Sequence, residues 1–238
     1  MPDSRTIDHT SFEIRKSLAG TPSMWDGYKF GVPGTYFSYF DDFLFFDVQH
    51  WIKHDITHAG TAALTDAIGG QLLLTNAAAD DDGTVLQLGT VNAATGESFI
   101  PTAGKRIFFE IRFQIAAAGV TQGDVIAGLC LADTTPMANT GSIAFCKDDG
   151  DTNLDFRVMN TTLAGEAVVT TIAAATWYKL GFKVTGTSHV EYWMNDVRIG
   201  ELAVTLPTSE MKLTFGIQNG EAAATTMTVD YVFIAQER

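Results

Sequence analysis

The sequence predicts an all-β protein: an antiparallel β-sandwich jelly roll of about a dozen strands, with an N-terminal extended arm. Two observations support this fold class. Apolar residues recur at every second position in many short segments, as expected of strands with one buried face. Turn-forming residues separate these segments roughly every 8–15 residues. A chain of 238 residues can build one large domain of this kind.

The clearest alternation lies in residues 176–203, which predict three successive strands. In the first two, every second residue is apolar and is expected to face the core, whereas the opposite face carries Trp177 and Trp193. Residues 186–188 and the pair Asn195–Asp196 supply the turns, because Gly, Asn and Asp tolerate positive φ. The residues expected to face the core are Tyr178, Leu180, Phe182, Val184, Val190, Tyr192 and Met194.

Further strands are expected along most of the chain. Residues 36–46 are apolar on both faces, with a bend expected at Asp41–Asp42, and residues 105–115 carry Phe108 out of step with their alternation. Both segments are typical of strands covered on two sides. The other expected strands are 51–56, 62–64, 71–75, 84–88, 125–132, 142–147, 154–159, 167–172, 212–218 and 227–235.

Residues 1–38 differ from the sandwich domain expected at residues 39–238. Thr10–Ser11 can cap a short helix that Gly20 ends. Aromatic residues between helix and strand breakers follow, in a segment too short to form a core of its own. The arm therefore either docks onto a partner or folds back onto its own sandwich, and the sequence favours neither. The arm residues expected to contact a partner are Phe12, Trp25, Tyr28 and Phe30.

Charge is distributed unevenly along the chain. The net charge is −13, and residues 1–38 contribute nothing to it because they hold four acidic and four basic residues. An acidic sandwich repels phosphate, so nucleic acid is excluded as an expected partner. No apolar run is long enough to span a membrane, and no secretory leader is apparent, so we expect a chain made in the cytoplasm.

The two cysteines are expected to be buried free thiols. Cys130 and Cys146 lie on neighbouring expected strands, but Cys130 should lie opposite about residue 143. A disulfide between them would therefore be out of register. Buried free thiols suit a reducing compartment.

The sequence contains no recognisable catalytic motif. Jelly-roll glycosidases carry paired carboxylates on one strand, as E-x-D-x-x-E, which puts all three in one cleft. Here Glu110, Glu191 and Glu201 each lack a carboxylate two residues away. Nucleotide-binding, zinc and G-x-S-x-G motifs are also absent from the sequence, so we expect a protein that is not an enzyme.

Three groups of residues are candidates for binding a ligand. His50, His54 and His58 have metal-like spacing, but no fourth ligand has a matching spacing, so surface histidines are the favoured interpretation. An acidic stretch has alternating oxygen ligands suited to calcium, but it lacks the EF-hand glycine and glutamate, so an acidic turn is the favoured interpretation. Its candidate ligands are Asp149, Asp151, Asn153 and Asp155. Trp177 and Trp193, if exposed, could stack on a sugar ring; covered rings are the alternative.

Several of these segments resemble a known superfamily. Residues 177–182, Val190–Tyr192 and the Asn195–Asp196 turn are similar to the concanavalin A-like lectin/glucanase jelly roll, in its laminin-G-like form. Further segments resemble a jelly-roll protein encoded among tailed-phage structural genes. The segments are 39–43, 147–151, 215–223 and 229–231, within residues 39–238.

The resemblance implies a virion component. The expected role is a non-enzymatic structural protein that decorates or stabilises the capsid, attached by the N-terminal arm. The expected partners are the major capsid protein, other virion proteins and further copies of the chain, and the expected location is the virion. The alternative is a lectin-like module of a head fibre or tail that binds a cell-surface glycan. Shared fold alone does not assign sugar binding.

Overall fold

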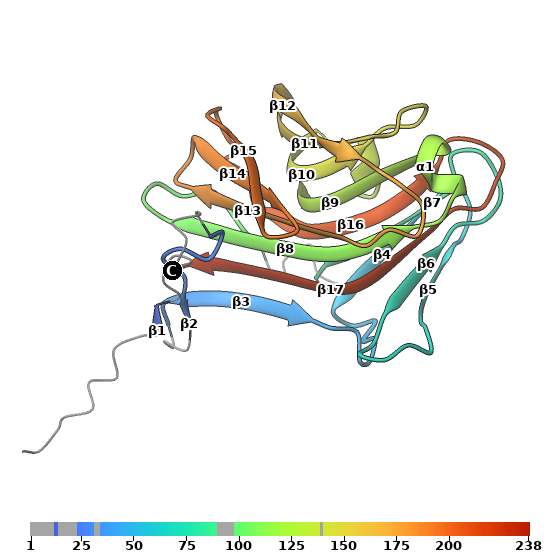
Figure 1. Ribbon diagram of the computed structural model, residues 1–238, viewed down its shortest axis with the longest axis horizontal. Coiled ribbons are helices and arrows are strands. Elements are labelled where there is room, and N and C mark those ends of the chain that lie inside the picture. The colour runs from blue at the N-terminus through green and yellow to red at the C-terminus, as the bar shows by residue number, and fades with distance from the viewer. Residues whose placement is uncertain (1–11, 14–22, 31–33, 90–97, 139) are drawn as a thin grey trace, which may run out of the picture.

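The computed structural model describes residues 12–13, 23–30, 34–89, 98–138 and 140–238. These residues form two antiparallel sheets packed face to face, which confirms the predicted all-β sandwich (Figure 1). In the seven-stranded sheet the order is β12 (Thr162–Thr171), β11 (Asn153–Asn160), β10 (Gly141–Lys147), β9 (Gly123–Leu131), β16 (Met211–Asn219), β7 (Gly83–Leu88) and β4 (Trp51–Ile56).

The eight-stranded sheet contains the C-terminal strand in its middle. Its order is β15 (Val197–Leu202), β14 (His189–Met194), β13 (Tyr178–Thr185), β8 (Arg106–Ile115), β17 (Thr226–Glu237), β6 (Leu72–Thr75) and β5 (Thr61–Leu64). Along one edge β17 pairs with β8, and along the other it pairs first with β6 and then with β3 (Tyr36–Asp41). The end of the chain therefore lies beside β3 (Figure 1).

The core lies between the two sheets and is rich in aromatic rings. Phe109 and Phe182 stack with their ring centroids 4.7 Å apart, and Phe156 stacks on Tyr192 across the sandwich at the same distance. Offset and edge-to-face ring contacts add to the burial of apolar area, which is the main favourable contribution to folding. The period-two alternation of the sequence supplies these residues, since one face of each strand points inward.

The three strands predicted within residues 176–203 are confirmed as β13, β14 and β15. The connection between β14 and β15 has φ values of 50° at Asn195 and 65° at Asp196. Positive φ at both positions is the geometry that suits a two-residue hairpin, because its twist matches that of the strands. The side chain of Asn195 also accepts a hydrogen bond from the backbone N–H of Lys179, at 3.1 Å.

Two details differ from the sequence prediction near the N-terminus. Phe12–Glu13 forms β1, which pairs with β2 (Lys29–Phe30), so these two residues are extended rather than helical; the rest of the expected helix lies outside the described residues. Strand β3 begins at Tyr36, so it crosses the expected domain boundary at residue 38. Residues 36–38 are part of the sandwich because they pair with β17.

The strand expected at residues 36–46 ends at Asp41, where the bend was expected. Oδ1 of Asp41 accepts a hydrogen bond from the backbone N–H of Phe43 at 2.9 Å, and Phe43 has a φ of 52°. This local turn directs the chain away from the sheet. Two short helices also occur, α1 (Ala118–Gln122) and the 3-10 turn η1 (Pro136–Ala138).

Part of the N-terminal arm folds back onto the outer face of the eight-stranded sheet. The ring of Trp25 stacks 6.1 Å from that of Phe108 and meets Phe233 edge-on at 5.3 Å. Tyr28 meets the same Phe108 at 5.3 Å and is buried. Phe108 is thus covered from outside, which explains why residues 105–115 break the simple alternation.

The cysteines are buried and free, as expected. Cys130 lies opposite Ser142, and Cys146 lies opposite Ile126, so the two thiols are out of register on β9 and β10. Burial raises the pKa of Cys130 and raises that of Cys146 to about 12, which keeps both thiols protonated and unreactive.

Candidate functional site

A pocket with both polar and apolar walls lies on the outer face of the seven-stranded sheet. Its volume is about 380 Å³, within the range of small-molecule sites. Strands β4, β7 and β16 lie side by side beneath it, and the loop that follows β9 forms its wall. The lining residues are Ile52, His54, Gln87, Ala132, Asp133, Thr134 and Lys212.

Gln87 holds the wall of this pocket against its floor. Its amide nitrogen donates to the carbonyl of Leu131 at 2.9 Å and to the hydroxyl of Thr214 at 3.0 Å, and its Oε1 accepts from the backbone N–H of Asp133 at 3.3 Å. Three hydrogen bonds to a buried side chain fix the loop relative to the sheet. The shape of the pocket is therefore maintained by hydrogen bonds within the fold.

Lys212 and His54 supply the polar groups of the floor. Lys212 is only 3% exposed, and its Nζ donates to the carbonyl of Leu88 at 3.3 Å. Nε2 of His54 is buried and has no hydrogen-bond partner within the described part of the chain. Burial lowers the pKa of His54, while Gln87 and Asp133 act in the opposite direction, so the imidazole is neutral near pH 7.

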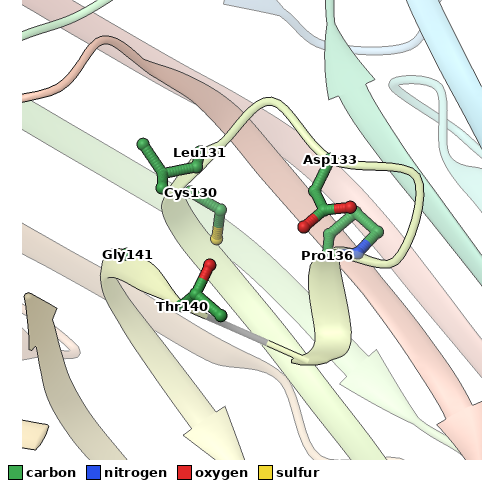
Figure 2. Close-up of a pocket in the computed structure, with 6 residues that line it drawn as sticks. All are labelled: Cys130, Leu131, Asp133, Pro136, Thr140 and Gly141. Atoms are coloured by element: carbon green, nitrogen blue, oxygen red, sulfur yellow. The ribbon is translucent and has the colours of Figure 1, made fainter. Parts of the chain in front are cut away.

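A loop separates this pocket from the rest of the outer face. Met137 of η1 packs onto a small apolar cluster of β7, β9 and β10 that includes Ile126 and Cys146. Figure 2 shows the cavity under this loop, where the sulfur of Cys130 and the hydroxyl of Thr140 point toward each other. Its volume is about 10 Å³, enough for one water molecule and no larger ligand.

Charged residues dominate the face beyond the loop. Arg157 on β11 binds Asp148 at 2.7 Å and Glu166 at 2.6 Å, and lies 3.9 Å from Asp155. The cavity beside it measures only about 30 Å³. These ion pairs link the turn after β10 to β11 and β12, and the cavity beside them is too small for a sugar.

The expected calcium ligands do not converge. Asp151 closes its own turn, because its carboxylate accepts hydrogen bonds from the backbone N–H groups of Thr152 and Asn153 and from the Asn153 side chain. Asp155 is placed beside Arg157, and the backbone N–H of Asp149 binds Asp124. The alternative of an acidic turn fits this geometry better.

The three histidines are also separated. His54 lies on β4, whereas His50 and His58 lie in the turns on either side of that strand. Nδ1 of His58 is 2.7 Å from the buried carboxylate of Asp82. Among the residues that the structure describes, no three His, Cys, Asp or Glu side chains are grouped so as to hold a metal ion.

The two tryptophans lie on the outer face of the eight-stranded sheet, but they are not equivalent. Trp193 is 3% exposed and lies below Lys183, so it offers no ring face to a sugar. Its neighbour on β13, Gly181, is covered by the side chain of Met24. Trp177 is half-buried, and the guanidinium of Arg112 lies 4.5 Å from its ring. Trp193 therefore follows the alternative of a covered ring.

The structure also shows where the arm residues expected at a partner contact lie. Trp25 and Tyr28 pack against their own sheet, as described above. Phe12 and Phe30 lie on the paired strands β1 and β2, and the structure describes only their backbone. The segment around Trp25 therefore follows the second of the two alternatives, in which the arm folds back.

The carboxylates considered for catalysis are engaged in ion pairs on the eight-stranded sheet. Glu110 accepts a hydrogen bond from the hydroxyl of Tyr231 at 2.7 Å and lies 3.6 Å from Lys179. Glu191 contacts Lys183 and Arg198, and Glu201 also pairs with Arg198. None of the three lines a cavity described above.

Sequence reasoning missed the residues that line the main pocket, His54 excepted. Gln87 and Lys212 are polar residues with an apolar neighbour on each side in the sequence, and both are almost fully buried. A buried polar residue in such a strand is an informative signal. It does not, however, show which strands lie side by side.

The comparisons with solved structures find this fold in proteins of very different sequence. A protein of unknown function from Shewanella oneidensis MR-1 has a TM-score of 0.63 and 10% identity, covering 94% of this chain and 95% of that one. A prokaryotic β-1,3-1,4-glucanase (lichenase) from a mouse hindgut metagenome has a TM-score of 0.60 and 14% identity, covering 83% and 98%. Peanut lectin has a TM-score of 0.58 and 10% identity, covering 84% and 97%.

These similarities show the jelly-roll sandwich fold, which the glucanase and the lectin share. Since enzymes and lectins share it, the fold does not assign an activity. No protein-family model and no curated protein matches the sequence. Within the described residues, no helix is long and apolar enough to cross a membrane.

Proposed function

We propose that this protein is a lectin-like module that binds a saccharide without cleaving it, in the pocket on the outer face of the seven-stranded sheet. The pocket itself is the observation that supports this proposal. It combines an apolar surface at Ile52 with hydrogen-bonding groups from His54, Lys212 and Thr134, and it is large enough for sugar rings. The similarity in fold to peanut lectin agrees with this proposal.

The carboxylates of the pocket favour binding over hydrolysis. Hydrolysis of a glycosidic bond normally requires two carboxyl groups on either side of the bond. Of the residues that line the pocket, only Asp133 carries a carboxylate. That carboxylate accepts hydrogen bonds from the backbone and hydroxyl of Thr135, so it serves to shape the loop.

A glycan array with the full chain tests the proposal. The variant Thr134→Trp places a large ring at the exposed rim of the pocket and should abolish binding, because it fills the cavity without disturbing the core. Thr187→Trp adds the same ring to an exposed turn elsewhere and should bind as the unmodified protein does. Binding that survives Thr134→Trp, or binding to no glycan at all, would contradict the proposal.

A second candidate function is that of a non-enzymatic virion structural protein, and an exposed apolar patch favours it. The loop between β3 and β4 and the turn between β5 and β6 lie together, because Gly70 packs against the backbone of Phe43. Their tips expose Leu44, Phe45, Val48 and Ile68, with exposed fractions between 56% and 103%. Contiguous exposed apolar side chains often mark protein contacts.

In that role the chain would decorate or stabilise a capsid, with the major capsid protein and further copies of itself as partners. Because Trp25 and Tyr28 are packed on their own sheet, attachment would use residues 1–22 and the loop tips. Deletion of residues 1–22, or the pair Phe45→Ser and Ile68→Ser, should release the protein from purified particles of the virus that encodes it. The proposal fails if the unmodified protein is absent from such particles.

A further inference from the structure

We infer that the saccharide bound in this pocket carries a carboxylate group, which Lys212 recognises. This inference rests on the proposed function and specifies its ligand as an acidic sugar, such as a uronate. The basis is the unusual surroundings of Lys212, a buried cation in the floor of a ligand-sized pocket that forms no ion pair with a described carboxylate.

Lys212 is almost completely buried, yet its ammonium is poorly satisfied. An ammonium has three donors, and Nζ uses one of them in a 3.3 Å hydrogen bond to the carbonyl of Leu88. Lys212 makes no ion pair with any described carboxylate. Gly89 leaves the space for this arrangement, since a Cβ there would lie 2.7 Å from Nζ. An anionic group in the pocket would compensate the buried charge.

The second buried lysine of the same sheet, Lys147, has its ammonium satisfied by the protein itself. Nζ of Lys147 donates to the carbonyl of Gly123 at 2.6 Å and to that of Asp148 at 3.1 Å. Burial lowers the pKa of Lys147, and the carboxylates of Asp124 and Asp149 act against that shift. The protein itself supplies hydrogen-bond acceptors and nearby carboxylates for the ammonium of Lys147. The ammonium of Lys212 has one acceptor, and its side chain lines the pocket.

The other polar groups favour an acidic sugar over a small inorganic anion. The cavity of about 380 Å³ is much larger than a phosphate ion. The carboxylate of Asp133 lines it as a hydrogen-bond acceptor, which suits hydroxyl groups and repels a multiply charged anion. The net charge of −13 also opposes a polyanion, so we expect one acidic sugar within an otherwise neutral saccharide.

The experiment compares glycans that differ in one group. Pairs of oligosaccharides ending in glucuronate or glucose, and in galacturonate or galactose, are titrated calorimetrically with the full chain, together with the methyl ester of each acid. The acid of at least one pair should bind ten-fold or more tightly than its neutral partner and its ester. Lys212→Met should remove this preference, while Lys179→Met, which removes a charge from the other sheet, should keep it.

The outcomes separate this inference from the proposed function. Equal binding of acid, ester and neutral sugar would overturn the inference and leave a saccharide-binding pocket. Binding of inorganic phosphate as tight as that of the acid sugar would also overturn it. If no saccharide binds, the proposed function itself fails. The ester comparison uses the unmodified protein, so the inference can be tested even if Lys212→Met does not fold.

Discussion

At the scale of single residues, burial controls the protonation of several side chains on the outer faces. Glu110 lies on β8, beneath the hydroxyl of Tyr231 and close to Lys179. Burial raises the pKa of Glu110 above its ordinary value of 4.5, although both neighbours act to lower it. The folded protein therefore holds this proton more tightly than the unfolded chain does.

The consequence is a pH-dependent contribution to stability. Since the pKa is higher in the folded state, the contribution of Glu110 is fully present below pH 4.5 and is lost as the pH rises through the folded-state pKa. Glu110→Gln should remove this dependence, because a neutral amide still accepts the hydrogen bond from Tyr231. Urea unfolding of both proteins between about pH 4 and pH 7 measures it. Identical pH profiles would contradict the assignment.

At the scale of elements, the segment around Trp25 acts as part of the sandwich. Its rings cover Phe108 and Phe233, which would otherwise be exposed on the outer face. Trp25→Ala should lower the free energy of unfolding by about 2–3 kcal/mol, near the low end for removing a packed aromatic ring. Deletion of residues 1–22, which leaves this segment in place, should change it by less than about 0.5 kcal/mol.

Chemical denaturation of the three proteins gives these values. A loss close to zero for Trp25→Ala would mean that the segment is not held on the sheet in solution. A large loss from the deletion would show that residues 1–22 also contribute to the fold.

The connection between β11 and β12 contains a strained residue. Thr161 has a φ of 66°, which a β-branched side chain rarely adopts. Its side chain is exposed, so Thr161→Asn should stabilise the protein by about 0.5–1 kcal/mol, because asparagine tolerates this conformation. Thermal unfolding should show a higher Tm.

Thr57 offers a matched control for this prediction. It has a similar φ of 65°, but its hydroxyl donates a hydrogen bond to the carbonyl of Asp81 at 3.2 Å. Thr57→Asn would relieve the backbone strain but would also lose this hydrogen bond, so the increase in Tm should be smaller than for Thr161→Asn. A lower Tm for Thr161→Asn would refute the strain argument.

The strands could be predicted from sequence much better than their partners. Period-two alternation depends on neighbouring residues, and so β13 and β14 were predicted close to their observed limits. The pairing of β3 with β17 joins Tyr36 to Glu237, and no local pattern indicates such a contact. The two short helices were missed because they are shorter than any periodic signal.

At the scale of the whole molecule, the candidate site could not be predicted for the same reason. His54, Gln87 and Lys212 come from three strands far apart in sequence, and a loop near residue 133 completes the pocket. The sequence pattern instead indicated tryptophans and an acidic turn as candidate ligand sites. The fold covers Trp193, and its hydrogen bonds close the turn at Asp151.

The two sheets therefore have different outer faces. The outer face of the eight-stranded sheet is covered in part by the segment around Trp25, and elsewhere it carries ion pairs such as that of Arg112 with Asp230. The outer face of the seven-stranded sheet carries the open pocket, and the loop at residues 132–134 forms the wall of this pocket. The proposed function requires a ligand in this pocket, and Trp177 on the other face is the alternative location.

Hydrogen–deuterium exchange with a saturating glycan from the array distinguishes these two locations. Backbone amides of residues 132–134 and of the adjoining ends of β4 and β7 should be protected by the ligand, because it contacts the wall and floor of the pocket. Amides around Trp177 should exchange at unchanged rates. Protection around Trp177 with unchanged exchange at residues 132–134 would place the binding site on the opposite sheet and contradict the account.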